Sequence, residues 1–325
     1  MSINNSPVIS LFWYDNNCYF VAVMRGWLSL PAITDFFHSV YVFINNDDKL
    51  KERMKNSMVL NIANVSEFLF NNPTIKGRLV VRRLLKLLVT YKPTGTIDCR
   101  FSDVCPTGRD CDSGEVLNYL NSIIEEELKH YSLVQFIDQY DNEVKFITDY
   151  NIFCPNSIGH RNSHNLVHEP IIMFNSAVYV ELKKYIQSDC KEITEFKPGE
   201  EIFCEQCNAK ISKIITVKFN RSAIFDYCNF DGYGGRHMLT YNIPLNYTFE
   251  VKNKGQTKKF ILRAYLVSSS GGESGHYWVY VLCNDNKWYE FNFNSIRVVN
   301  EPLPAVINST GRFSRVTLFY DVQHK

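Results

Sequence analysis

Three side chains that are far apart in the sequence could together cleave an amide bond through attack by a thiol. Cys18 follows the polar run Asp15-Asn16-Asn17 and opens an apolar segment that predicts a buried helix over 18–30. At a helix N-terminus, unpaired backbone N–H groups and the helix dipole favour the thiolate, which is the nucleophilic form of cysteine. Cys18 is therefore the candidate nucleophile; the alternative is a small apolar core residue.

A histidine and an asparagine stand at the ends of two aromatic segments near the C-terminus. His276 follows a glycine-rich run and begins an alternating apolar strand, and Asn292 ends the run 288–292. The intervening Asn284-Asp285-Asn286 is typical of a hairpin turn, which would bring His276 close to Asn292, with Asn294 as the second choice. A cysteine, a histidine and an asparagine that meet in space are the signature of cysteine-dependent acyl transfer. The alternative for His276 and Asn292 is an ordinary strand-end residue.

Four segments carry a resemblance to a known family, in the right order. The segment Asp15–Phe20 resembles the Cys box of the ubiquitin-specific proteases, Asp112–Leu120 the helix that follows it, Phe203–Cys207 half of the zinc-binding fingers, and Phe260–Asn292 the His box. Trp13 makes the Cys box more similar to that of a relative, the coronavirus papain-like protease. The resemblance implies a papain-like α+β fold with a helical thumb over 1–133, and with β fingers and an antiparallel β palm over 134–325.

The resemblance also implies a role for each residue of the site. Cys18 would form a thioester, His276 would move the proton, and Asn292 would orient the imidazole. The indole N–H of Trp13 can only donate, so it suits an oxyanion, and Asn17 is a second candidate donor. The alternative for Trp13 is a packed core residue.

Two further groups are implied to bind the substrate. Asp112 and Glu115 lie three residues apart on one helix face and would hold the basic, glycine-terminated tail of ubiquitin; the alternative is a helix cap. The loop Ser268–Gly275, rich in serine and glycine, would close over the Gly-Gly end in a channel too narrow for a Cβ. Its expected contacts are Gly271, Gly272, Gly275 and Tyr277.

A pair of cysteines has the spacing of half a zinc site. Cys204 and Cys207 are separated by two residues, as in zinc knuckles. Cys154 with His160 or His164 would complete a structural zinc site that takes no part in catalysis. The alternative is a degenerate finger that binds no metal.

Charge and composition exclude some function classes. The chain has 325 residues, 35 basic and 34 acidic side chains and a net charge of +1, which argues against a nucleic-acid-binding protein built on Cys204 and Cys207. No apolar run approaches the roughly 18 residues of a membrane span. The first residues lack the features of a signal peptide, and ten scattered cysteines suit reduced thiols, so we expect a cytoplasmic or nuclear protein, or the host cytoplasm if it is viral.

Helical patterns precede strand patterns along the chain, which predicts the α+β class. The predicted helices are 18–30, 32–41, 47–58, 66–70, 76–90 and 112–130. From about Val134 onward the predicted strands are 145–148, 171–174, 178–182, 211–218, 222–228, 262–268, 277–283, 288–293 and 315–320.

The sequence thus predicts a monomeric deubiquitinating cysteine peptidase that cleaves after the C-terminal Gly-Gly of ubiquitin or a ubiquitin-like protein. One alternative is a viral papain-like protease that also processes a polyprotein at Gly-Gly sites. The other is an inactive ubiquitin-binding scaffold of the same fold.

Overall fold

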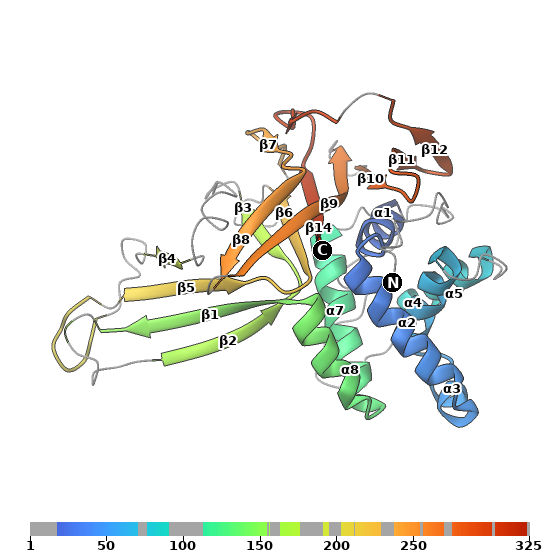
Figure 1. Ribbon diagram of the computed structural model, residues 1–325, viewed down its shortest axis with the longest axis horizontal. Coiled ribbons are helices and arrows are strands. Elements are labelled where there is room, and N and C mark those ends of the chain that lie inside the picture. Colours follow the sequence, from blue (N-terminus) through green and yellow to red (C-terminus); the bar gives the residue numbers. More distant parts are fainter. Residues whose placement is uncertain are drawn as a thin grey trace.

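The structure is a computed structural model in which the described residues form a helical layer, two larger β-sheets and a short two-stranded one (Figure 1). It describes residues 18–70, 77–90, 113–154, 156, 163–175, 191–194, 203–210, 212–228, 237–253, 256–269, 275–300 and 303–323. The predicted strand 178–182 lies outside these ranges.

The N-terminal part of the described chain is helical. The helices are α1 (Cys18–Trp27), α2 (Pro31–Asn45), α3 (Asp48–Met54), α4 (Met58–Phe70), α5 (Gly77–Thr90), α7 (Ser113–His130), α8 (Val134–Gln139) and the π-helical turn η1 (Tyr140–Val144). The segment 134–144 lies before the first predicted strand, 145–148, and forms two short helical elements that were not predicted. The ring of Phe136 packs edge-on against Phe36 of α2, at 6.3 Å between centroids, and this burial favours a helix there.

Local signals explain where several helices begin. Pro31 opens α2, where a missing N–H costs nothing. The Asp47 carboxylate caps α3 by accepting hydrogen bonds from the backbone N–H groups of Lys49 and Leu50, at 2.9 and 3.0 Å. The start of α4 is capped from a distance, because the buried Glu127 of α7 accepts from the amides of Met58 and Val59, both at 2.8 Å.

The large sheet has eight described strands in the order β12-β11-β10-β9-β14-β6-β3, with β8 also paired to β9. Every pairing is antiparallel except that of β3 with β6. The strands are β3 (Ile172–Asn175), β6 (Ser222–Cys228), β8 (Thr248–Asn253), β9 (Gln256–Ser269), β10 (His276–Leu282), β11 (Trp288–Asn292), β12 (Ser295–Val298) and β14 (Arg315–Val322).

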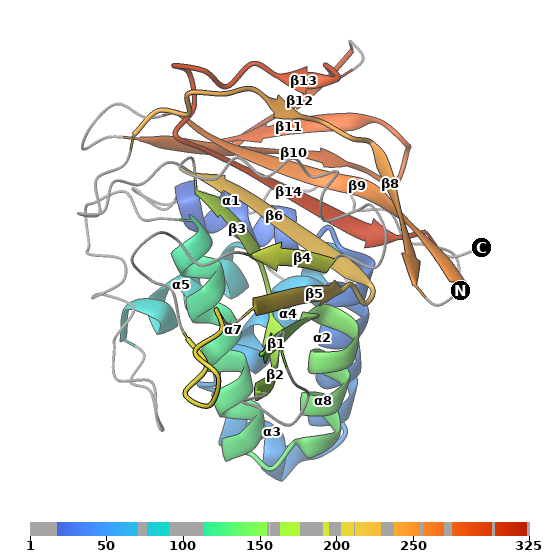
Figure 2. The same cartoon turned by 90° about the vertical axis from the view of Figure 1, so that its left-hand side faces the viewer.

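A second sheet extends away from the helices as long antiparallel strands in the order β2-β1-β5-β4 (Figure 1). It comprises β1 (Phe146–Phe153), β2 (Ser163–Glu169), β4 (Lys191–Thr194) and β5 (Ser212–Lys218). A short pair, β7 (Ile243–Pro244) with β13 (Val306–Ile307), lies at the opposite side of the large sheet from the helices (Figure 2). The domain boundary at 133/134 stays a prediction.

The large sheet is buried on both faces, and its two faces serve different cores. Residues Ala264, Leu266, Val279 and Val281 pack with the helices in one apolar cluster. Their alternating neighbours Tyr265, Val267, Trp278 and Tyr280 belong to the cluster on the other face. The helix α1 therefore seats on one face of β9 and β10, and the segment around β13 covers the other (Figure 2).

Within the described ranges, no single helix is long and apolar enough to cross a bilayer. The helices α1 and α2 reach that length and composition only when they are taken together, and the chain bends by 92° between them.

Candidate active site

The candidate nucleophile is the first described residue of α1. Cys18 is buried, with 4% of its surface exposed, in the core between the helices and the large sheet. The helix lies very close to the sheet, because a Cβ on Gly26 would stand only 2.8 Å from Cε2 of Phe319 in β14. The position of Cys18 is therefore set by tight packing of α1 against the strands.

Two contacts of Arg25 hold the last turn of α1 against the large sheet. The buried guanidinium of Arg25 lies 4.4 Å from the ring centroid of Phe291 in β11. The same guanidinium contacts the thiol of Cys283, just beyond the C-terminal end of β10. The last turn of α1 therefore lies against β11 and beside Cys283, which follows the C-terminal end of β10.

The predicted histidine and asparagine are hydrogen-bonded. His276 begins β10, Asn292 ends β11, and the two strands pair with Val279 opposite Phe291. The distance from His276 Nε2 to Asn292 Oδ1 is 2.7 Å. An amide oxygen only accepts, so Nε2–H is the donor in this hydrogen bond, and Nδ1 is the other ring nitrogen.

An aromatic residue that the sequence analysis did not single out lies flat against this imidazole. The ring centroids of Phe293 and His276 are 3.9 Å apart with an interplanar angle of 13°, and Trp278 stacks at 5.6 Å. Phe293 has a φ of +52° in the two-residue turn between Asn292 and Ser295, at a position where glycine is favoured. Its position directly after the candidate Asn292 was the only signal in the sequence.

The other predicted site residues are distributed as follows. Glu115 is exposed in the first turn of α7, Gly275 is partly buried before β10, and Tyr277 is buried in the core that also contains Cys18. His164 lies in β2 opposite Asn151. The residues outside the described ranges are Trp13, Asn17, Asp112, His160, Gly271 and Gly272.

Three predicted metal ligands meet at one end of the second sheet, just beyond β1. The sulfur atoms of Cys154, Cys204 and Cys207 all lie within 4.8 Å of one another, and those of Cys154 and Cys207 are 3.4 Å apart. Cys154 directly follows β1, whereas the other two cysteines belong to a tight turn closed by the bridge between Phe203 and Lys210. Thiolates clustered in this way are ligands that Zn²⁺ prefers.

The turn around Cys204 is built to hold thiolates. Burial raises the pKa of Cys204, but hydrogen bonds from the backbone N–H groups of Gln206 and Cys207 outweigh it and bring the pKa to about 7. The Asn156 amide also donates to Cys207 Sγ, at 3.7 Å. Asn208, with a φ of +55°, closes the turn through its N–H bond to the Cys204 carbonyl, at 2.7 Å.

Solved structures of a deubiquitinating module are among those similar to this chain. One is the Ubp8/Sgf11/Sus1/Sgf73 module of SAGA bound to ubiquitin aldehyde, with a TM-score of 0.67, 13% identity, and coverage of 99% of this chain and 71% of that chain. Another is the yeast module with an Sgf73 mutant, with a TM-score of 0.67, 14% identity, and coverage of 99% and 70%. The chain therefore has the α+β fold of the ubiquitin-specific proteases, as the sequence predicted.

The family follows from the sequence itself. The family model described as ubiquitin carboxyl-terminal hydrolase matches residues 14–320, and the chain belongs to this family of deubiquitinating enzymes. No curated protein matches the chain.

Proposed function

We propose that this protein is a cysteine peptidase that cleaves the bond after the C-terminal Gly-Gly of ubiquitin or a ubiquitin-like protein. The observation that carries the proposal is the 2.7 Å hydrogen bond between His276 and Asn292, on strands that pack against the helix headed by Cys18. Family membership supports the substrate class, since the family is named for hydrolysis at the ubiquitin carboxyl terminus.

Each group of the site has a defined task in this proposal. With Nε2 held by Asn292, His276 uses Nδ1 to take the proton of Cys18, and the thiolate attacks the carbonyl carbon of the terminal glycine. The imidazolium then gives its proton to the leaving amine, which departs as the thioester forms. Water, deprotonated by the same nitrogen, hydrolyses the thioester and restores the thiol. Trp13 and Asn17 are the proposed donors to the oxyanion, and Asp112, Glu115, Gly271, Gly272, Gly275 and Tyr277 the proposed contacts of the ubiquitin tail.

The test uses a ubiquitin probe with an electrophile at its C-terminus. We expect the wild-type protein to form a covalent adduct on Cys18, and the Cys18→Ala variant to form none. Cys228→Ala removes another buried thiol, far along the chain in β6, and serves as the matched control that keeps its labelling. Labelling that survives Cys18→Ala, or its absence in the wild type with ubiquitin and ubiquitin-like probes alike, would favour the inactive scaffold.

The same chemistry would serve polyprotein processing at Gly-Gly junctions. A peptide that spans such a junction, offered beside the ubiquitin substrate, separates the two roles. Comparable kcat/KM for both substrates would support processing, whereas a strong preference for ubiquitin would support deubiquitination alone.

We also propose that Cys154, Cys204 and Cys207 hold one structural zinc ion with His160 as the fourth ligand. The three converging sulfurs support this assignment, and four protein ligands would leave no open position for catalysis. The monomeric state and a reducing, cytoplasmic or nuclear location remain proposals of the same kind.

A further inference from the structure

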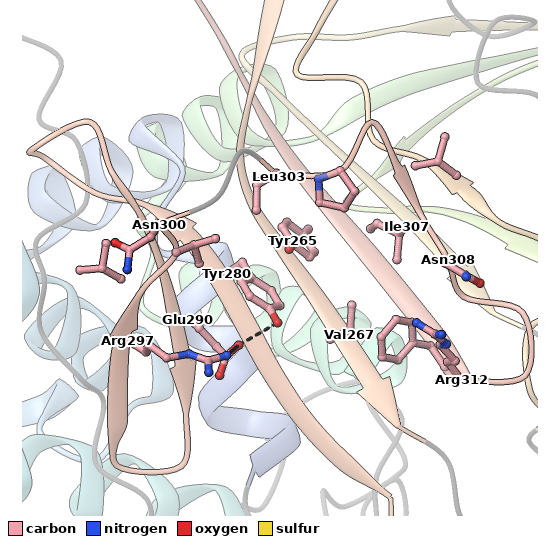
Figure 3. A pocket seen from close by; sticks show the side chains of 15 residues that line it. Tyr265, Val267, Tyr280, Glu290, Arg297, Asn300, Leu303, Ile307, Asn308 and Arg312 are labelled. Atoms are coloured by element: carbon pink, nitrogen blue, oxygen red, sulfur yellow. Dashed lines mark hydrogen bonds and ion pairs between the residues drawn. The ribbon is translucent and has the colours of Figure 1, made fainter.

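A pocket of about 690 Å³ lies on the face of the large sheet opposite α1. Its floor comes from β9 to β12, and its roof is the segment 303–313 that crosses over these strands (Figure 3). The roof is anchored by the pairing of Val306 with Pro244 and by the hydrogen bond from Leu245 N–H to the Ala305 carbonyl, at 2.8 Å. The pocket is thus formed by fixed backbone and has a volume usual for small-molecule sites.

One row of polar side chains crosses the floor from strand to strand. The register places Tyr265 opposite Tyr280, Tyr280 opposite Glu290, and Glu290 opposite Arg297. The two tyrosine rings stack with centroids 4.5 Å apart. The Tyr280 hydroxyl donates to the Glu290 carboxylate at 2.8 Å, and Arg297 pairs with the same oxygen, also at 2.8 Å. These contacts hold the floor in one arrangement before any ligand binds.

The hydroxyl of Tyr265 is the polar group of the floor that still lacks a partner. Tyr265 is 5% exposed and lines the pocket, and within the described part of the chain its hydroxyl makes no hydrogen bond. The hydroxyl is therefore available to donate a hydrogen bond to a polar atom of a molecule in the pocket.

Charge gives the second requirement on a ligand. Glu290 and Arg297 neutralise each other, whereas Arg312 on the roof is exposed and has no ion pair among the described residues. Figure 3 shows Arg297 and Arg312 at separate ends of the pocket, with the two tyrosines between them. The rest of the lining is mostly apolar and includes Val267, Leu303, Ile307 and Phe313, together with Asn300 and Asn308.

We propose that this pocket binds a small organic anion with a flat apolar body. The body would lie between the tyrosine floor and the apolar roof, a polar atom on it would satisfy the Tyr265 hydroxyl, and its carboxylate, sulfonate or phosphate would pair with Arg312. The site lies apart from Cys18, on the other face of the sheet, and does not depend on the proposed peptidase activity.

The test uses 8-anilinonaphthalene-1-sulfonate, a fluorescent flat anion, and N-phenyl-1-naphthylamine, its uncharged counterpart. Arg312→Gln should raise the Kd of the anionic probe about tenfold, as expected for loss of a charge-assisted hydrogen bond, and should leave the Kd of the neutral probe unchanged. Val267→Trp should fill the pocket and weaken both probes. Arg82→Gln, an exposed arginine on α5, is the matched control that changes neither.

Arg312 is exposed, so its replacement leaves the core intact and the comparison does not depend on the fate of Val267→Trp. Equal binding of the anionic probe by the wild type and Arg312→Gln would overturn the proposal, as would an equal loss of the neutral probe in that variant.

Discussion

His276 is held on two sides, by the last residue of β11 and by the turn residue that follows it. Asn292 fixes the ring through Nε2, and Phe293 covers one face of the imidazole. A bulky residue at positive φ is unfavourable, so the turn accepts a local cost that places this ring over the histidine. At this scale Phe293 is a positioning residue, because it acts on the reaction through His276.

Replacing Phe293 tests this role. Phe293→Ala should lower kcat for a fluorogenic ubiquitin substrate about fivefold, since an aromatic stack contributes on the order of 1 kcal/mol, while KM stays the same. Phe293→Tyr keeps the ring and should retain the wild-type kcat. A kcat equal to wild type in Phe293→Ala, or one that is equally low in both variants, would speak against positioning by the ring.

The residues that carry the chemistry were predictable because their types are rare and their neighbours are informative. Cys18 at a helix start, and His276 and Asn292 at the ends of strands joined by a hairpin turn, follow from local sequence. Phe293 and Tyr265 were not singled out, because their roles depend on what lies across the strands. Cys154 could be predicted to lie near Cys204 and Cys207 because two cysteines supply only half of the ligands of a zinc site.

At the scale of elements, the packing of α1 against the large sheet determines the position of Cys18. Gly26 allows the helix to approach β14 at a distance that no side chain would permit. Gly26→Ala should cost about 1–3 kcal/mol of unfolding free energy through overpacking, measured in urea.

The control for this substitution is the double mutant with Phe319→Leu. The Gly26→Ala effect should be smaller in the Phe319→Leu background, because the smaller side chain relieves the clash. Strictly additive effects would show that the contact between Gly26 and Phe319 does not set the helix position.

The cap of α4 is a second feature of this scale. The Glu127 carboxylate accepts two backbone N–H bonds in a buried setting, so Glu127→Ala should lower the unfolding free energy by about 2 kcal/mol. Glu52→Ala on α3 removes an exposed carboxylate in a surface ion pair and should change it by less than about 0.5 kcal/mol. Similar small losses in both variants would contradict the capping role.

The proposed zinc site at the end of the second sheet consists of the cluster of Cys154, Cys204 and Cys207. Metal analysis of the purified protein should give one zinc per chain, and Cys204→Ser or Cys207→Ser should reduce it to near zero. Cys228→Ala, outside the cluster, should keep the full amount. A metal-free wild-type protein after expression with added zinc would contradict the assignment.

The elements were predicted with uneven success for physical reasons. The strands β6, β10 and β11 alternate or carry long apolar runs and were recognised. The segment 134–144 is short and polar on one side, so its helical state depends on packing against Phe36, which the sequence does not show. β2 was missed because its sequence contains two histidines and an asparagine and no apolar run. Its strand conformation follows from its pairing with β1, which the sequence does not show.

At the scale of the molecule, charged residues hold the helical layer to the large sheet. Arg221, before β6, pairs with Asp35 of α2 at 2.7 Å and with Glu143 of η1 at 3.0 Å. The buried pair of Asp226 and Arg315, at 2.9 Å, lies directly under Gly114 in the first turn of α7. The α+β class could be predicted from the order of the elements, whereas the charges that join the helices to the sheet could not, because they depend on contacts between distant segments.

The separation of the Cys18 sulfur and the His276 Nδ1 atom tests the central claim most directly. It can be measured in a crystal structure of the protein joined to the ubiquitin electrophile. Our account predicts a covalent bond from Cys18 to the terminal glycine, with the His276 nitrogen within hydrogen-bonding reach of that sulfur. An adduct on another cysteine, or a Cys18 sulfur separated from His276 by intervening protein, would contradict it.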